Sequence, residues 1–165
     1  MSTPESPRQG TVAATRVEMT QMVLPQFANA LGNVFGGQIM AWIDICAAVA
    51  AQRHCRADVV TASFDAVHFI APVKQGHIVI LRSQVNAAFS TSVECGVLVT
   101  MEDPLTGVHR RAAKAYATFV PLDPHGKPQA VPPLQLLSDD DRRRAAAAAM
   151  RKTGRLEMRR AQERA

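Results

Sequence analysis

The sequence has few aromatic residues and no long apolar run. Phenylalanine, tyrosine and tryptophan make up 5% of the 165 residues, although 47% of the chain is hydrophobic. We therefore expect one domain whose core is aliphatic and rich in alanine. No apolar run is long enough to span a membrane, and residues 1–10 lack the apolar core of a signal peptide. These absences predict a cytoplasmic protein without a membrane-spanning helix.

Cysteine is also scarce, with three residues far apart at positions 46, 55 and 95. No C-x-x-C motif or Cys/His cluster is present, so the sequence predicts no metal site. An odd number of widely spaced cysteines does not suggest a disulfide framework. We expect these thiols to be reduced and buried, as is usual for cysteines of cytoplasmic proteins.

The chain carries a net charge of +5, but this charge is concentrated in one segment. Residues 142–165 contain nine lysines or arginines and two glutamates, which leaves a net charge of −2 on the rest of the chain. The basic character therefore belongs to the tail and is weak support for nucleic-acid binding. The tail also lacks interleaved aromatic residues that would stack on bases, so we do not expect nucleic acid as a partner.

Residues 37–52 are predicted to form a helix with almost no polar face. Its large apolar residues are Ile39, Met40, Trp42, Ile43, Ile45 and Val49. A helix that is apolar all round is predicted to be buried. Asp44 is the only charged residue in it, and an unpaired carboxylate in such a setting costs on the order of several kcal/mol. Asp44 is therefore a candidate for chemistry. The alternative is a core helix with one satisfied aspartate.

The residues at the start of this helix suit an anion. Gly36 and Gly37 stand where the helix should begin, and free backbone N–H groups there, with the positive end of the helix dipole, would stabilise a developing oxyanion. We expect Gly37 to be the main donor and Gly36 the weaker candidate. Asn33 adds an amide side chain nearby. The alternative is a glycine-rich helix entry with no chemical role.

The rest of the chain predicts strands around this helix. Alternating apolar positions predict strands over residues 11–23, 59–69, 77–89, 91–102 and 108–121. One strand, a long helix and four strands fit an α+β domain over residues 11–122, in which an antiparallel sheet packs one face on the helix. The flanking segments are predicted to be a disordered leader (1–10), a proline-rich linker (123–137) and a basic, solvated helical tail (138–165) that begins at S-D-D-D.

Four stretches carry a specific resemblance to a known family, and they occur in the right order. They are G-N-V-F-G-G-Q-I-M-A-W-I-D at 32–44, R-H-C at 53–55, V-T-A-S-F-D-A-V-H-F-I-A-P-V at 60–73 and A-F-S-T-S-V-E-C-G-V-L-V at 88–99. These motifs resemble the hotdog-fold acyl-CoA thioesterases of the cytosolic acyl-CoA hydrolase group. The resemblance implies a hotdog fold, an antiparallel sheet of about five strands wrapped around the long central helix.

The resemblance also implies an activity, the hydrolysis of fatty acyl-CoA to free fatty acid and coenzyme A, without a metal or other cofactor. Asp44 would be the general base or the nucleophile, and the sequence leaves both roles open. Gly37 would donate to the oxyanion, and Asn33 would orient the water or the thioester carbonyl. Because the family builds this site at a dimer interface, we expect a homodimer, and by analogy a trimer of dimers, in which Asn33 of one copy meets Asp44 of the other.

Contacts to coenzyme A are expected along the later motifs. The candidates are Phe69, Ala71, Pro72, Val73, Lys74, Arg82, Thr91 and Ser92. Arginines of the tail are further candidates for the phosphates, and an exposed strand charge is the alternative for Arg82. Two other functions stay open, a non-catalytic acyl-CoA sensor and a hotdog dehydratase. A dehydratase would need a histidine on the central helix, and none lies between Asp44 and His54.

Overall fold

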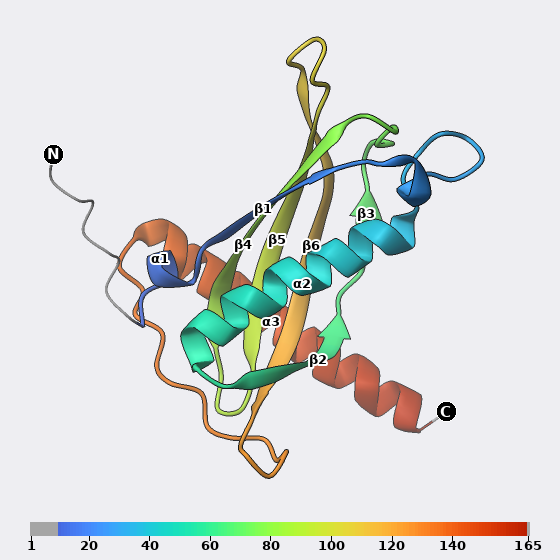
Figure 1. The fold of residues 1–165 in the computed structure, drawn as a ribbon. Coiled ribbons are helices and arrows are strands. Elements are labelled where there is room, and N and C mark those ends of the chain that lie inside the picture. Colours follow the sequence, from blue (N-terminus) through green and yellow to red (C-terminus); the bar gives the residue numbers. More distant parts are fainter. Residues whose placement is uncertain (1–9, 165) are drawn as a thin grey trace, which may run out of the picture.

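The computed structural model describes residues 10–164 and shows a curled antiparallel sheet with a long helix on each face (Figure 1). The elements in chain order are α1 (Val12–Thr15), β1 (Val17–Met22), the 3-10 helix η1 (Pro25–Phe27), α2 (Gly36–Cys55), β2 (Asp58–Phe64), β3 (His68–Phe69), β4 (Ile78–Ala88), β5 (Val93–Glu102), β6 (His109–Leu122) and α3 (Asp139–Glu163). Apart from Gly10, the predicted leader lies outside the described residues.

The sheet has the strand order β1-β4-β5-β6-β2, and the short β3 pairs with β6 next to β2. Each neighbouring pair is antiparallel. Alternate residues of the central strands are buried against α2, and they are mostly valine and alanine: Val79, Leu81, Val85, Cys95, Val97, Val99, Ala113, Ala115 and Ala117. This arrangement confirms the predicted α+β fold, in which a curled sheet wraps around a central helix and a helix follows at the C-terminus.

The central helix differs from its prediction in one respect that matters for the site. It is buried on most sides, but one stripe of it, formed by Gly37, Met40, Ala41, Asp44 and Ile45, is half-buried or exposed. Ile45 has an exposed fraction of 54%. The prediction that α2 lies entirely in the core is therefore wrong for the single chain. The reason is that the adjoining strand β2 is the last of the sheet and covers only part of the helix.

Two predicted strands are also shorter than expected. The first begins at Val17, because Thr11 caps the short helix α1 by accepting a hydrogen bond from the Ala14 N–H at 3.3 Å. The strand predicted over residues 59–69 is divided into β2 and β3. It breaks where the Asp65 N–H donates to the Tyr116 carbonyl and the Asp65 side chain pairs with Arg155 of α3.

Helix α3 starts as predicted and then packs more closely than predicted. The side chain of Ser138 accepts from the Asp141 N–H, and the Asp141 side chain accepts from the Ser138 N–H, which completes a capping box. The helix continues through Gly154 without interruption. The expectation of a solvated helix is wrong on one face, because Ala148 is buried and Arg151 binds a fully buried carboxylate, that of Glu94. Within residues 10–164, no helix is both long and apolar enough to cross a membrane.

Candidate active site

Asp44 lies in the middle of α2 and is held by a residue of the neighbouring strand. The Thr61 hydroxyl of β2 donates to Asp44 Oδ1 at 2.7 Å. No other described residue donates a hydrogen bond to this carboxylate. Asp44 is half-buried and Thr61 is exposed, so the pair is open to the surface formed by α2 and β2. This arrangement fixes one carboxylate oxygen and leaves the other available to accept a proton.

The start of α2 provides the free N–H groups that the sequence predicts. The helix begins at Gly36, and no side chain caps it. Among residues 10–164, neither the Gly36 N–H nor the Gly37 N–H has a hydrogen-bond acceptor. A Cβ atom on Gly36 would lie 3.3 Å from the Phe69 ring, whereas one on Gly37 would meet nothing within 4 Å. Gly36 therefore permits close packing against Phe69, whereas the side-chain position of Gly37 is open.

Five of the predicted site residues line one cavity of about 280 Å³ next to this helix start: Asn33, Phe69, Ala71, Pro72 and Val73. The segments that carry them are joined by a hydrogen bond from the Val34 N–H to the Val73 carbonyl at 2.8 Å. Gly36 and Ile39 of α2 complete the wall. The structure thus places the predicted amide, the predicted channel residues and the helix start in a single concave site.

The structure does not bring the other predicted coenzyme A contacts to this cavity. Lys74 lines an adjoining cavity of about 520 Å³, which shares Ala71 and Pro72 with the first. Arg82 lies on the outer face of the sheet, where its Nε pairs with Glu18 at 2.7 Å. Thr91 and Ser92 lie in the turn between β4 and β5. Within one copy of the chain, Arg82 is therefore separated from Asp44 by the sheet.

The loop before α2 contains an asparagine that the sequence analysis did not single out. Asn29 is half-buried, and its Oδ1 accepts from the N–H groups of Leu31 at 2.9 Å and Asn33 at 3.1 Å. The next turn needs Gly32, whose φ of +74° lies in the left-handed region. Because the side-chain oxygen Oδ1 of Asn29 accepts hydrogen bonds within the loop, only its side-chain NH₂ group is left to donate to a ligand.

The cysteines have no place in this site. All three are buried free thiols. Burial raises the pKa of Cys46 and of Cys55 to about 11. A thiol that is protonated at neutral pH is a poor nucleophile. This agrees with the helical spacing, since Cys46 follows Asp44 by two residues and lies on a different side of α2.

The middle portion of this chain matches a known protein family. Residues 31–108 match the family described as the thioesterase superfamily. An uncharacterized acyl-CoA thioester hydrolase of Bacillus subtilis is 40% identical over 128 residues, which are 78% of this chain and 74% of that protein. The cytosolic acyl coenzyme A thioester hydrolase of Mus musculus is 32% identical over 131 residues, and the chain spans only 34% of its length.

Solved structures match nearly the whole chain. An acyl-CoA hydrolase of Staphylococcus aureus, in complex with butyryl coenzyme A, coenzyme A and coenzyme A disulfide, has a TM-score of 0.83 and 34% identity, covering 94% of this chain and 98% of that one. A hexameric acyl-CoA thioesterase without ligand has a TM-score of 0.87 and 34% identity, covering 92% of this chain and 97% of that one.

Three further structures of the S. aureus hydrolase carry alanine in place of one asparagine, one aspartate or one threonine. In that protein the asparagine lies 15 positions before the aspartate, and the threonine lies 17 positions after it. Asn29, Asp44 and Thr61 have the same spacing here. Thr61 lies on the polar face of its strand within a family motif, which is a signal that sequence reasoning could have used. The identity and the shared fold place this chain among the hotdog-fold acyl-CoA thioester hydrolases of the thioesterase superfamily.

Proposed function

We propose that this protein hydrolyses fatty acyl-CoA thioesters to free fatty acid and coenzyme A, at sites that two copies of the chain form together. The observation that carries the proposal is the Asp44 carboxylate, which is held by Thr61 and open on the exposed stripe of α2. The names of the relatives and the coenzyme A ligands of the S. aureus structure support the substrate class. The cytosolic mouse relative supports a cytoplasmic location.

Helix geometry is the reason for placing the site between two copies. Gly37 and Asp44 are seven positions apart, so they lie on the same side of α2 about 10 Å apart along its axis. A base and an oxyanion donor must each lie within about 3 Å of the reacting atoms. One helix cannot meet that requirement with these two residues. A second copy packed on the exposed stripe can bring its Gly37, with its Asn29 and Asn33, to Asp44 of the first.

In the proposed reaction, water is the nucleophile and Asp44 is the general base. The free carboxylate oxygen takes a proton from water as the water oxygen attacks the thioester carbonyl carbon. The Gly37 N–H of the other copy stabilises the oxyanion of the tetrahedral intermediate. The intermediate then expels coenzyme A thiolate, which receives the proton from Asp44. Coenzyme A enters only as part of the substrate, and no metal or redox group takes part.

The cavity at the helix start is proposed to receive the thioester end of the substrate. Its apolar wall of Phe69, Ala71, Pro72 and Val73 suits the pantetheine arm or the first acyl carbons. Lys74, which lines the adjoining cavity, is the proposed partner for the phosphates of coenzyme A. Thr91 and Ser92, together with Arg82, stay predicted contacts, which in an oligomer would face substrate bound by another copy.

The proposal is tested by hydrolysis of an acyl-CoA panel from acetyl to palmitoyl, with the released thiol detected and with a metal chelator in a parallel series. We expect turnover that the chelator does not change, with the panel giving the chain-length preference. Binding of acyl-CoA without turnover of any member would overturn the hydrolase and leave the acyl-CoA sensor. Consumption of enoyl-CoA without release of thiol would instead identify a dehydratase or hydratase.

The pairing of two copies gives a separate prediction. Ile45→Asp places a carboxylate on the apolar stripe, and burying it at an interface costs on the order of several kcal/mol. We expect sedimentation velocity to show a smaller assembly than the wild type, and turnover to fall with the loss of the assembled fraction. Met150→Asp is the matched control, because Met150 is exposed at 77% on α3. An Ile45→Asp protein of wild-type mass would refute this interface.

The two asparagines should behave differently when each is replaced by alanine. We propose the Asn29 NH₂ group as a second donor to the oxyanion beside Gly37. Asn29→Ala removes it, and the loss of one such donor lowers kcat by about 10²–10³-fold. Asn33→Ala changes a residue of the cavity wall, so we expect mainly a higher KM. Steady-state kinetics on the best substrate of the panel separates these effects. A large loss of kcat in Asn33→Ala with little change in Asn29→Ala would assign the donor to Asn33.

A further inference from the structure

Strand β2 contains a β-bulge directly after Thr61. Thr61 pairs with Phe119 of β6, and Ser63 pairs with Thr118, the residue next to Phe119. Ala62 is therefore an extra residue that has no partner on β6. A bulge of this kind changes the direction in which the following side chains point, and bulges are frequent next to active sites. The bulge therefore decides which side chains of β2 face the candidate active site.

The bulge places Thr61 and Asp65 on opposite faces of the sheet. In a regular strand the side chains alternate, so residues four positions apart share a face. Here the Thr61 hydroxyl donates to Asp44 of α2 at 2.7 Å. The Asp65 carboxylate instead pairs with Arg155 of α3. Because the two helices lie on opposite faces of the sheet (Figure 1), a β2 without the extra residue could satisfy only one of these contacts.

The partners of these residues on β5 and β6 agree with this division of faces. In the row that contains Thr61, the paired residues are Phe119 and Val93, and both are buried in the core around α2. In the row that contains Ser63, the residue of β5 is Glu94, whose carboxylate binds arginines of α3. Side chains at paired positions project from the same face of a sheet. The rows on the two sides of the bulge therefore face different helices.

The Arg155 guanidinium holds the chain just beyond the bulge. Its Nη1 lies 2.8 Å from Asp65 Oδ2, 3.1 Å from Asp65 Oδ1 and 3.0 Å from Glu94 Oε2. Its Nη2 is buried and has no hydrogen-bond partner among residues 10–164. A single nitrogen thus joins the two carboxylates. The Asp65 and Arg155 side chains are only 18% and 19% exposed, so this pair is better shielded from water than a surface pair.

The neighbouring Arg151 shows that fixing α3 to the sheet does not require a contact with β2. Arg151 binds the same Glu94 carboxylate, with its Nη2 2.7 Å from Oε1. In the described part of the chain it has no hydrogen bond or ion pair to Asp65. Arg151 therefore joins α3 to β5 alone, whereas Arg155 also holds the end of β2. This difference indicates a role for Arg155 besides holding the helix.

We propose that Arg155 is a positioning residue for thioester hydrolysis, which acts through Asp65 to hold β2 in its bulged register. That register keeps the Thr61 hydroxyl on the Asp44 carboxylate. A slip of one residue would turn the side chains of the strand to the other face and remove this donor. The inference rests on the proposed roles of Asp44 and Thr61 in catalysis. Arg155 acts from the other face of the sheet, without contact to the reacting atoms.

The experiment compares Arg155→Met with Arg151→Met, because both remove one arginine from Glu94 but only the first releases Asp65. We expect Arg155→Met to lower kcat about tenfold with little change in KM, the effect of losing a hydrogen bond to a charged group. Arg151→Met should stay within about twofold of the wild type. Arg155→Lys should restore most of kcat, since one ammonium can replace Nη1 between the two carboxylates. Steady-state kinetics are measured at a temperature at which thermal unfolding shows each variant folded.

Coupling to Thr61 separates positioning from simple anchoring. The losses of independent residues multiply, whereas residues that act through one another give a smaller combined loss. In a Thr61→Val background, Arg155→Met should therefore lower kcat by less than about a further twofold. Multiplied losses would overturn the proposal, and so would equal losses of kcat in Arg155→Met and Arg151→Met. Both arginines would then only fix α3 to the sheet.

Hydrogen exchange of the backbone amides of residues 58–65 gives a second measurement that does not depend on turnover. Exchange there should be faster in Arg155→Met and in Asp65→Ala than in Arg151→Met. Asp65→Ala leaves both arginines on Glu94, so it tests the hold on β2 even if Arg155→Met does not fold. Full kcat in Thr61→Val would refute the proposed catalytic role of Thr61, while faster exchange in Asp65→Ala would still support the hold on β2. Equal exchange in all three variants would overturn it.

Discussion

Asp44→Asn should lower kcat/KM for acyl-CoA hydrolysis by about 10²–10⁴-fold, the usual contribution of a positioned general base. The replacement is chosen because asparagine has nearly the same shape and its Oδ1 can still accept the hydrogen bond from Thr61. What it loses is the ability to take a proton from water. The measurement is steady-state kinetics on the best substrate of the panel, with thermal unfolding showing that the variant is folded.

Two controls make this result specific. Thr61→Val keeps the carboxylate but removes the donor that fixes it, so we expect a smaller loss than in Asp44→Asn. A single turnover in ¹⁸O-labelled water tests the nucleophile role. Label in the carboxyl group of Asp44 requires a mixed anhydride that water opens at the aspartyl carbon, whereas direct attack of water on the thioester, or opening of the anhydride at the acyl carbon, places the label only in the fatty acid. Full activity in Asp44→Asn would refute Asp44 as general base and as nucleophile, even if the protein is an acyl-CoA hydrolase.

Much of the fold could be predicted because the dominant signals are local. The strands β4, β5 and β6 follow from a period of two in apolar residues, since each has one face on α2. The capping box at Ser138 is likewise contained in four consecutive residues. For the site, the sequence places Asn33, Gly36 and Phe69 in motifs, and the structure brings these motifs to one cavity.

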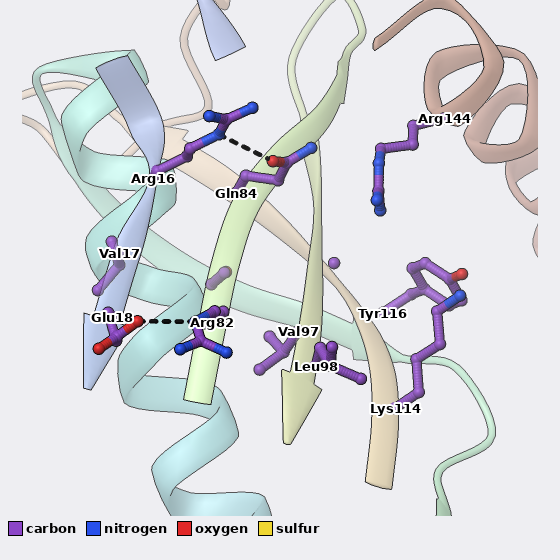
Figure 2. A pocket seen from close by; sticks show the side chains of 12 residues that line it. Arg16, Val17, Glu18, Arg82, Gln84, Val97, Leu98, Lys114, Tyr116 and Arg144 are labelled. Carbon is purple, nitrogen blue, oxygen red and sulfur yellow. Dashed lines mark hydrogen bonds and ion pairs between the residues drawn. The ribbon is translucent and has the colours of Figure 1, made fainter. Parts of the chain in front are cut away.

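The features that could not be predicted depend on contacts between distant segments. The break at Asp65 depends on Arg155, 90 residues later in the chain. The exposed stripe of α2 depends on where β2 ends the sheet, which the apolar pattern of the helix does not contain. The groove on the outer face of the sheet likewise combines residues of β1, β4, β5, β6 and α3 (Figure 2). Periodicity identifies each of these elements but not the register that brings their side chains together.

The second large effect concerns the buried charges beneath α3. Glu94 of β5 is fully buried, and two arginines of α3 satisfy it: Arg151 Nη2 lies 2.7 Å from Oε1, and Arg155 Nη1 lies 3.0 Å from Oε2. Arg155 also binds Asp65 Oδ2 at 2.8 Å. The three ion pairs therefore join α3 to the sheet and to the connection between β2 and β3, close in sequence to Thr61.

Replacing both arginines, as Arg151→Met/Arg155→Met, should lower the free energy of unfolding by about 3–5 kcal/mol, because it leaves a buried carboxylate with only the Asn86 Nδ2 donor at 3.5 Å. Adding Glu94→Leu to that variant removes the stranded charge, and we expect it to restore most of the loss. Glu94→Leu alone should cost less, since Arg151 and Arg155 are 24% and 19% exposed and retain access to water.

Urea denaturation at one fixed protein concentration measures all three variants, because an oligomer's apparent stability depends on concentration. The pattern across the variants is more informative than any single value. If the three ion pairs were ordinary surface pairs, each change would cost less than about 1 kcal/mol and the triple variant would be the least stable. If Glu94 is instead a buried charge that α3 must neutralise, the triple variant will be more stable than the double. That order would establish α3 as an integral layer of the domain, fixed to the sheet on the face opposite α2.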